Sequence, residues 1–225
     1  MIVEDVLNRY IVAGQNTLSE SDSKKIIAEY DISVTKEKTV DSLDKAIRAA
    51  EEIGFPIVMK GSGSGFSHKS ELGMVRVGLR DVDEIRHHFT GLSNIMKGRG
   101  QVLVQQMVSG EREFLLGAKR DEQFGPVVTF GLGGVFAEVF NDVSMRVAPI
   151  SKFDAIQMIN EIRASSLLGN FRGMGEVNTE KLINNLIALG NLCLEHVHVA
   201  EVDINPLIIE KGEAIAVDAL IVLAV

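Results

Sequence analysis

Three features are scarce or missing in this sequence, and each absence narrows the class of protein. A single cysteine, Cys193, among 225 residues excludes an internal disulfide. Its place in an apolar helical run favours a buried thiol in a reducing compartment. No apolar run approaches the roughly 18 residues that span a membrane, and the N-terminus lacks the basic and apolar stretches of a signal peptide. We therefore expect a soluble, cytoplasmic protein.

An excess of positive charge is also missing. The net charge is −8, which argues against nucleic acid as the main partner, because that partner selects a basic surface. Small nucleotides stay possible, since a few local cations and backbone amides can bind phosphates. The 46% hydrophobic and 24% charged residues are ordinary for a soluble protein, and the length suffices for one large domain or two compact lobes.

Helical and strand patterns alternate along the chain. Thr17 with Glu20, and Ser151 with Asp154, each predict a capping box at the start of a helix. The other expected helices run over residues 43–53, 81–96 and 179–194, and the expected strands over residues 56–60, 73–77, 101–107, 113–117, 126–130, 196–209 and 214–223. We place a lobe boundary near residues 105–110. This divides the chain into an N-terminal helical extension (1–16), a smaller lobe (17–106) and a larger lobe (107–225).

A glycine-rich loop follows the strand that ends at Lys60. Its glycines, Gly61, Gly63 and Gly65, would let backbone amides approach phosphate oxygens closely. In a dinucleotide-binding fingerprint a helix follows the glycine-rich loop, whereas a strand follows it here. The pattern therefore favours a hairpin flap that covers phosphates over a dinucleotide-binding loop. Lys60 can place its ammonium group on a phosphate. The alternatives are a flexible surface loop and an ordinary surface lysine.

His68 lies just beyond this loop. A histidine ring nitrogen can accept a phosphoryl group and pass it on, which splits one transfer into two easier steps. The alternative is a loop histidine without a chemical role.

The most informative segment runs from Glu201 to Leu207. Alternate side chains of a strand share a face, so Glu201, Asp203 and Asn205 point one way and the apolar residues between them point the other. Three oxygen-bearing groups on one face are costly unless a cation lies there. His196 and His198 belong to the opposite face without a cysteine nearby, which argues against zinc.

The C-terminal hairpin pairs Asn205 with an acidic residue. If Lys211-Gly212 is the two-residue turn, counting outward along both strands brings Asn205 opposite Asp218, and a four-residue loop gives the same pairing. Their Cβ atoms would then lie about 5 Å apart. Two such oxygen ligands, completed by waters and phosphates, are how Mg²⁺ is usually held. The alternative is a salt bridge to an arginine.

Taken together, these motifs resemble one protein family. The chain is similar, over about residues 18–223, to the beta subunit of ADP-forming acetyl-CoA synthetase, an ATP-grasp protein related to the beta subunit of succinyl-CoA synthetase. The segments that carry the resemblance are Lys60 with its loop, His68-Lys69-Ser70, Phe124-Gly125-Pro126, Gly131-Leu132-Gly133-Gly134, Asp142-Val143-Ser144 with Arg146, Leu168-Gly169 with Arg172-Gly173, and Glu201 to Leu207.

The resemblance implies an ATP-grasp fold of the α+β class, in which two α/β lobes clasp ATP or ADP. It implies phosphate contacts from Lys60 and the glycine loop, and a hinge beside the adenine that includes Gln106 and Val108. It also places Glu113 near the nucleotide, and Arg146 either on phosphate or in a structural salt bridge. The implied Mg²⁺ ligands are Asn205 and Asp218, with His68 as the phosphoryl carrier and Asp203 as the residue that orients the phosphohistidine.

The resemblance also implies an activity and a partner. The expected reaction converts acyl-CoA, ADP and phosphate into the organic acid, CoA and ATP, together with a CoA-binding alpha subunit in an α2β2 assembly. Two alternatives stay open: another ATP-grasp acid ligase, and a non-catalytic subunit that senses nucleotides. His68 distinguishes them, because a sensor needs no phosphate carrier.

Overall fold

The chain folds into two compact units. The computed structural model describes residues 2–62, 72–97, 100–134 and 140–224. Unit 1 comprises Met1–Val34 with Val108–Val225, and unit 2 comprises Thr35–Met107. The chain therefore passes between the units after Val34 and again after Met107. The second passage falls in the region where the sequence indicated a boundary.

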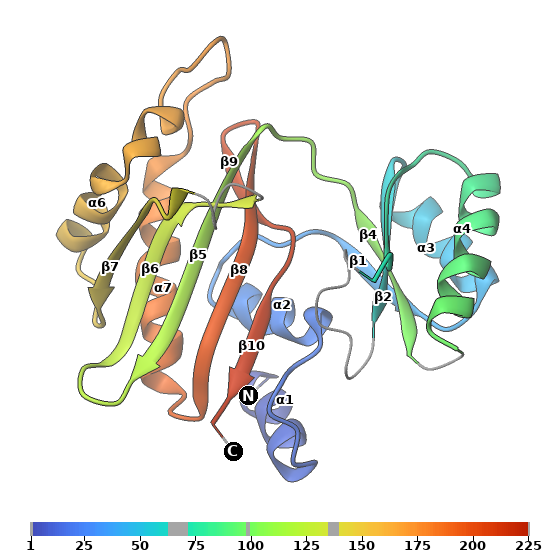
Figure 1. Cartoon of the computed structure of the whole chain (residues 1–225), viewed down its shortest axis with the longest axis horizontal. Coiled ribbons are helices and arrows are strands. Elements are labelled where there is room, and N and C mark those ends of the chain that lie inside the picture. The colour runs from blue at the N-terminus through green and yellow to red at the C-terminus, as the bar shows by residue number, and fades with distance from the viewer. Residues whose placement is uncertain (1, 63–71, 98–99, 135–139, 225) are drawn as a thin grey trace. The chain divides into compact units, whose positions relative to one another are not determined.

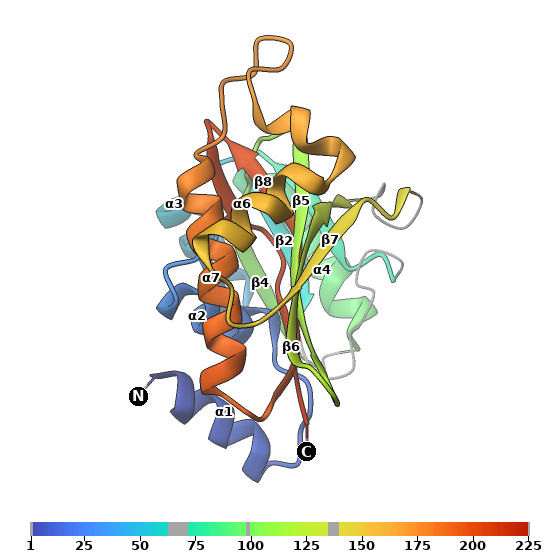
Figure 2. The same ribbon diagram turned by 90° about the vertical axis from the view of Figure 1, so that its left-hand side faces the viewer.

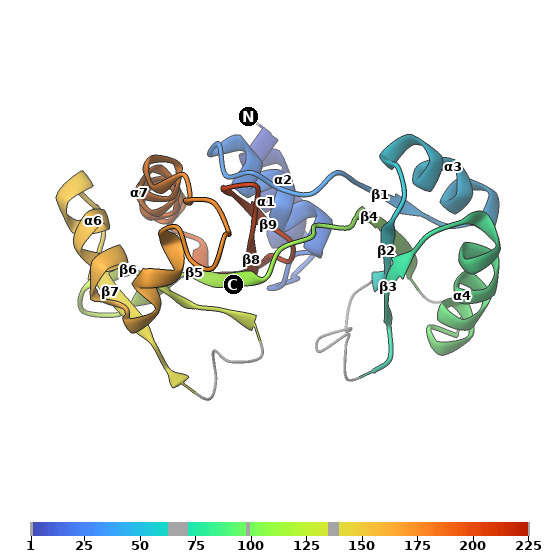
Figure 3. The same ribbon diagram turned by 90° about the horizontal axis from the view of Figure 1, so that it is seen from above.

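Unit 2 is a four-stranded antiparallel sheet with two helices on one face (Figure 3). Its strands follow the order β1 (Glu37–Val40), β4 (Gln101–Gln106), β2 (Ile57–Ser62) and β3 (Val75–Leu79), and its helices are α3 (Leu43–Ile53) and α4 (Val82–Ile95). The expected elements of this region are confirmed. Ile57 and Met59 belong to the core beneath the helices, so strand alternation directs Val58 and Lys60 to the other face.

Unit 1 contains a six-stranded antiparallel sheet. The order is β10 (Leu220–Leu223), β8 (Val199–Glu210), β5 (Arg112–Asp121), β6 (Gly125–Leu132) and β7 (Val143–Val147), and β9 (Glu213–Ala216) pairs with β8. Helices α6 (Lys152–Glu161) and α7 (Thr179–Glu195) cover one face (Figures 1 and 2). None of the described helices is both long and apolar enough to cross a membrane.

The two faces of this sheet differ in chemistry because the strands alternate. Phe114 and Leu116 of β5, and Val202 and Ile204 of β8, are at most 1% exposed in the core beneath the helices. The residues between them face the other way. We call this second surface the polar face; it carries the side chains of Glu113, Glu201, Asp203 and Asn205, which the sequence pattern placed together on one side of a strand.

The first 34 residues belong to unit 1, which differs from the expected division at residues 16 and 17. Helices α1 (Ile2–Val12) and α2 (Glu20–Glu29) contribute apolar side chains, among them Ile26, to the unit 1 core. The Leu18 N–H also donates to the Ile221 carbonyl over 3.0 Å. Burial of these side chains against β10, rather than proximity along the chain, decides where the segment packs.

The cap of α2 also differs from the expected one. Ser19 is the N-cap, and its hydroxyl accepts the Asp22 N–H over 3.1 Å. Thr17 instead pairs with Val222 at the edge of the sheet, which removes it from the helix start. The capping box of Ser151 and Asp154 at α6 is confirmed.

Several residues of the family-like motifs hold the framework together. The Asp142 carboxylate accepts the N–H groups of Arg163 and Ala164, each over 2.8 Å, and so caps the 3₁₀ helix η2 (Arg163–Leu168). The Ser144 hydroxyl donates to the Met158 carbonyl of α6 over 2.8 Å. These contacts attach the helical layer to β7 and give Asp142 and Ser144 structural roles.

Candidate nucleotide and metal site

The C-terminal hairpin has the register that the sequence predicted. Glu210 lies opposite Glu213, and Leu207 lies opposite Ala216. Further along β8, Asp203 lies opposite Leu220. The same register therefore continues across the gap between β9 and β10, where it sets Asn205 opposite Asp218. The Lys211-Gly212 turn has positive φ angles of 52° and 87°, as a type I′ hairpin turn requires.

A glycine run fixes the Asn205 side chain. The backbone N–H of Gly134, just after β6, donates to Asn205 Oδ1 over 3.1 Å. Gly134 has a φ of +67°, and a Cβ there would lie 1.9 Å from Glu113 Oε2. The Glu113 carboxylate is therefore packed against a backbone that only glycine allows. Three segments distant in sequence bring Glu113, Gly134 and Asn205 together on the polar face.

The polar face concentrates negative charge. Asp203 is accessible to solvent, yet the surrounding protein removes part of its hydration, and this raises its pKa above the ordinary 3.8. The like charges of Glu201 and Asp218 raise its pKa further. The influence of Asp218 on this pKa is consistent with the hairpin register, which sets Asp218 near Asp203 along the paired strands. A divalent cation would relieve this repulsion.

The donor set is suited to a cation that is also held by a ligand. Within the described ranges, no group of three or more His, Cys, Asp or Glu side chains could hold a metal ion by itself. Asn205 and Asp218 supply one amide oxygen and one carboxylate. Mg²⁺ usually takes one or two protein ligands and completes its shell with waters and substrate phosphates. The residues present fit such a shared ion better than a closed structural site.

Unit 2 and the segment that connects it to unit 1 carry the other residues that the sequence predicted for the nucleotide site. Lys60 lies inside β2, between β3 and β4, and is only 5% exposed; the strand continues to Ser62 instead of ending at the lysine. Gly61 packs closely, because a Cβ there would lie 3.2 Å from Met74 Sδ. Gln106 ends β4, and Val108 begins the return to unit 1. Gly63, Gly65 and His68 lie outside the described residues.

Arg146 is directed away from the polar face. It belongs to the same side of β7 as Ser144, which contacts α6, and its guanidinium donates to the Glu161 carboxylate of α6 and, over 2.8 Å, to the Met145 carbonyl. The hydrogen bond that Arg146 donates to the Glu161 carboxylate raises the pKa of Arg146. Of the two roles considered for this residue, the structure shows the salt bridge. It does not bring Arg146 together with Asn205 and Asp203.

The sequence pattern alone did not indicate the role of the glycines at the end of β6. The run Gly131-Leu132-Gly133-Gly134 was noted only as part of a resemblance. In the structure, Cβ atoms at Gly131 and Gly133 would lie 2.5 Å and 2.3 Å from backbone oxygens of Asp142 and Phe114. A dense glycine run at a strand end indicates close backbone approach, but nothing local names Glu113 and Asn205 as the neighbours.

Comparison with known proteins identifies the family of this fold. Residues 9–223 match the family described as ATP-grasp domain. The beta subunit of acetate–CoA ligase (ADP-forming) I from Pyrococcus furiosus is 39% identical over 217 residues, which cover 94% of each chain. A structure of Candidatus Korarchaeum cryptofilum acetyl-coenzyme A synthetase 1 is 40% identical and covers 99% of this chain and 100% of that chain, with a TM-score of 0.88. That structure contains coenzyme A and Mg-AMPPCP, and its phosphohistidine segment points towards the nucleotide-binding site.

One further relative is a longer protein. Acetate–CoA ligase (ADP-forming) I of Archaeoglobus fulgidus is 35% identical over 218 residues, which cover 94% of this chain but 32% of that protein. The expected ATP-grasp fold is confirmed. In the Archaeoglobus protein, the region that matches this chain is one part of a longer polypeptide. The chain belongs to the ATP-grasp family and, within it, to the beta subunits of the ADP-forming acetate–CoA ligases.

Proposed function

We propose that this chain is the nucleotide-binding subunit of an ADP-forming acyl-CoA synthetase. With a CoA-binding alpha subunit, it converts acyl-CoA, ADP and phosphate into the organic acid, CoA and ATP. The observation that carries this proposal is the convergence of Glu113, Gly134 and Asn205 on the polar face, with Asp218 opposite Asn205 in the hairpin register. Family membership over nearly the whole chain supports the same conclusion.

The Glu113 carboxylate is available for a ligand. It has no hydrogen bond or ion pair among the residues that the structure describes, although Gly134 holds it in place. In this proposal Glu113 accepts hydrogen bonds from the nucleotide, and the backbone that includes Gln106 and Val108 contacts the base. Lys60 and the amides of Gly61, Gly63 and Gly65 contact phosphates, where a fixed cation and backbone dipoles stabilise negative charge.

Asn205 and Asp218 would hold Mg²⁺ together with the nucleotide phosphates. The bound ion would offset phosphate charge during phosphoryl transfer. The Gly134 N–H donates to the amide oxygen of Asn205 and so fixes the orientation of this amide. The second lone pair of the same oxygen would then coordinate the cation. Positioning of this kind accounts for most catalysis in phosphoryl transfer, because the protein needs little covalent chemistry of its own.

His68 is the proposed phosphoryl carrier of this subunit. Its ring nitrogen attacks the phosphorus of the incoming phosphohistidine, the bond to the donor histidine breaks, and the phosphoryl group then passes to ADP. Asp203 orients the phosphohistidine by accepting a hydrogen bond from the imidazole, and its raised pKa follows from the same crowded face. In the proposed α2β2 assembly the donor histidine belongs to the alpha subunit, and the enzyme works in the cytoplasm.

Calorimetry of nucleotide binding tests the metal site. Asp218→Ala should weaken binding of Mg-ADP at least tenfold and leave binding of metal-free ADP nearly unchanged, since only the metal-bound complex uses the carboxylate. Equal losses for both ligands would assign Asp218 a structural role. Asp121→Ala, an exposed aspartate in the β5–β6 turn, is the control and should change neither affinity.

Phosphate labelling tests the carrier. Incubation of the assembled enzyme with γ-³²P-ATP and Mg²⁺ should give acid-labile label on this subunit, and His68→Ala should remove it. His198→Ala is the control and should retain the label. Undiminished label in His68→Ala, with Mg-ADP binding intact, would remove the carrier assignment while keeping the nucleotide site.

A further inference from the structure

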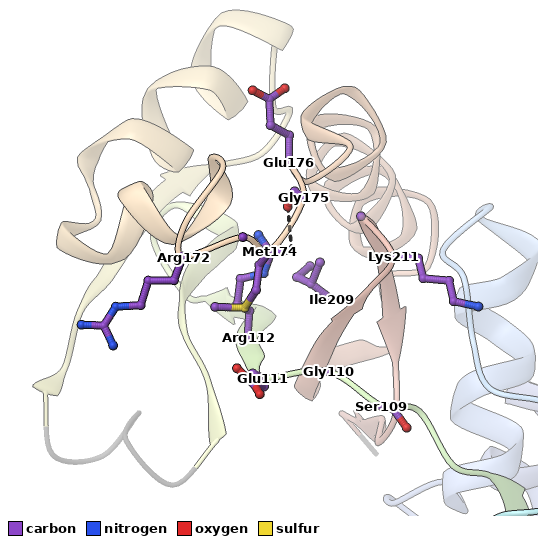
Figure 4. A pocket seen from close by; sticks show the side chains of 12 residues that line it. Ser109, Gly110, Glu111, Arg112, Arg172, Met174, Gly175, Glu176, Ile209 and Lys211 are labelled. Carbon is purple, nitrogen blue, oxygen red and sulfur yellow. Dashed lines mark hydrogen bonds between the residues drawn. The ribbon is translucent and has the colours of Figure 1, made fainter.

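A cavity lies within unit 1, at the end of the sheet where β5 begins. It has a volume of 730 Å³ and is lined by backbone of Gly110, Gly173, Gly175 and Gly212 and by side chains that include Arg112, Met174 and Ile209 (Figure 4). Arg112 and Glu113 are successive residues of β5, so their side chains point to opposite faces. The cavity is therefore separate from the proposed nucleotide site.

Arg112 is the buried charge in this cavity. Its side chain is held by three carbonyls: Nη1 donates to Leu167 at 3.0 Å and Gly169 at 3.4 Å, and Nη2 donates to Gly175 at 2.9 Å. The residue is 5% exposed, and no carboxylate in the described part of the chain forms an ion pair with it. Burying a cation without an anionic partner costs several kcal/mol in general, so this environment favours an anion.

The guanidinium has donors to spare. An arginine carries five N–H groups. Among the described residues, three carbonyl oxygens accept hydrogen bonds from Nη1 and Nη2 of Arg112, and no acceptor contacts Nε. The side chains of Arg172, Glu176 and Lys211 extend away from the centre of the cavity, where Arg112, Met174 and Ile209 lie (Figure 4). Glu111 is the lining carboxylate nearest to Arg112 in this view; it is exposed to solvent and forms no ion pair with the arginine among the described residues.

We propose that this cavity binds an organic carboxylate with an apolar body. The carboxylate accepts hydrogen bonds from the free N–H groups of Arg112, which suit a planar oxyanion, and the body packs between Met174 and Ile209. The volume is that of a small-molecule site rather than of a single ion. The glycines of the lining leave room for the ligand and for close approach of the backbone.

Methionine-methyl NMR tests this proposal with phenylacetate as the probe. In the ¹³C-methyl-methionine-labelled chain, phenylacetate should shift the Met174 signal saturably, and the signal of Met145, an exposed residue of β7, should stay unchanged. The neutral analogue phenylacetamide should bind at least tenfold more weakly because it lacks the charge. Inorganic phosphate should also bind at least tenfold more weakly, because it lacks the apolar body. Met174→Leu assigns the signal.

Two variants separate the site from the fold. Arg112→Met should lower phenylacetate affinity at least tenfold. Gly175→Leu should do the same while it keeps both the arginine and the backbone carbonyl of residue 175 that accepts from it, because a Cβ at Gly175 has no neighbour within 4 Å and projects into open space. Gly91→Leu on α4, equally unobstructed, should keep full affinity.

Three results would overturn the proposal: no shift of Met174, equal binding of phenylacetamide, or unchanged phenylacetate affinity in Gly175→Leu. Mg-ADP binding measured on the same samples keeps this test distinct from the proposed function. Gly175→Leu should bind Mg-ADP normally, so a variant that loses only phenylacetate binding supports the cavity site. Failure of the chain without substitutions to bind Mg-ADP would instead contradict the proposed nucleotide site.

Discussion

The backbone N–H of Gly134 donates to Oδ1 of Asn205 over 3.1 Å, across 71 positions of sequence. This bond connects the segment after β6 with the C-terminal hairpin. Because Glu113 packs on the same glycine, the amide oxygen and the carboxylate have fixed positions before any ligand arrives. Fixed donors and acceptors reduce the ordering cost of binding, which supports the proposal that the polar face binds a nucleotide.

Removing the Asn205 side chain should affect binding in the presence of metal. Asn205→Ala loses one proposed ligand of Mg²⁺ and leaves the Gly134 N–H without its acceptor. We expect Mg-ADP affinity to fall at least tenfold, which corresponds to about 1.4 kcal/mol. Calorimetry checks this, with Asn160→Ala on the exposed side of α6 as the control. An unchanged Mg-ADP affinity in Asn205→Ala would exclude Asn205 from the metal site.

A methyl group at Gly134 should displace Glu113. Gly134→Ala places a Cβ 1.9 Å from the carboxylate and strains a φ of +67°, so we expect a loss of about 1 to 3 kcal/mol in the free energy of unfolding. Gly91→Ala in α4 should instead stabilise by up to about 1 kcal/mol, because alanine favours helices and meets no obstacle. Urea unfolding measures the free energy of unfolding of both variants. An unchanged free energy of unfolding in Gly134→Ala would argue against tight packing of Glu113 on Gly134.

Asp203 should make stability depend on pH. Its folded pKa is raised above the unfolded value of 3.8, so its favourable contribution is present below pH 3.8 and is lost as pH rises through the folded pKa. Asp203→Asn should therefore raise the melting temperature at pH 7, and the gain should shrink as pH falls towards 3.8. Thermal melts at several pH values check this.

Asp41 supplies the opposite sign as a control. Its hydrogen bond with Lys45 lowers its pKa below 3.8, so it stabilises above 3.8 and this contribution is lost as pH falls through the folded pKa. Asp41→Asn should lower the melting temperature slightly at pH 7. If both variants shifted it in the same direction at pH 7, the charge crowding around Asp203 would not control its effect.

Cys193 should be unreactive in the folded chain. It is a residue of α7 and is 3% exposed on the buried side of that helix. Burial raises its pKa to about 11, so little thiolate forms at neutral pH. A chromogenic thiol reagent should label it at the rate of unfolding, and urea should accelerate the labelling. Complete labelling within minutes in native buffer would contradict the buried position. Because Cys193 is the only cysteine, no second thiol complicates the measurement.

Much of the candidate site could be predicted from the sequence because its rules are local. The two-residue period of β8 put Asp203 and Asn205 on one face, and the Lys211-Gly212 turn set the register that brings Asn205 opposite Asp218. The capping box at Ser151 depends on residues three positions apart. Each inference needed only neighbouring residues and the geometry of one element.

The sequence by itself thus determined most of the helices and strands, the two faces of β8 and the pairing of its hairpin, but it indicated neither β1 nor β7 and did not divide β9 from β10. Only the tertiary structure decided that residues 1–34 join unit 1, that Arg146 binds Glu161 behind the sheet, and that Gly134 holds Asn205 and Glu113. These contacts depend on which surfaces bury apolar area against each other. Such packing joins residues that are far apart in the sequence, and their sequence separation does not predict their distance in space.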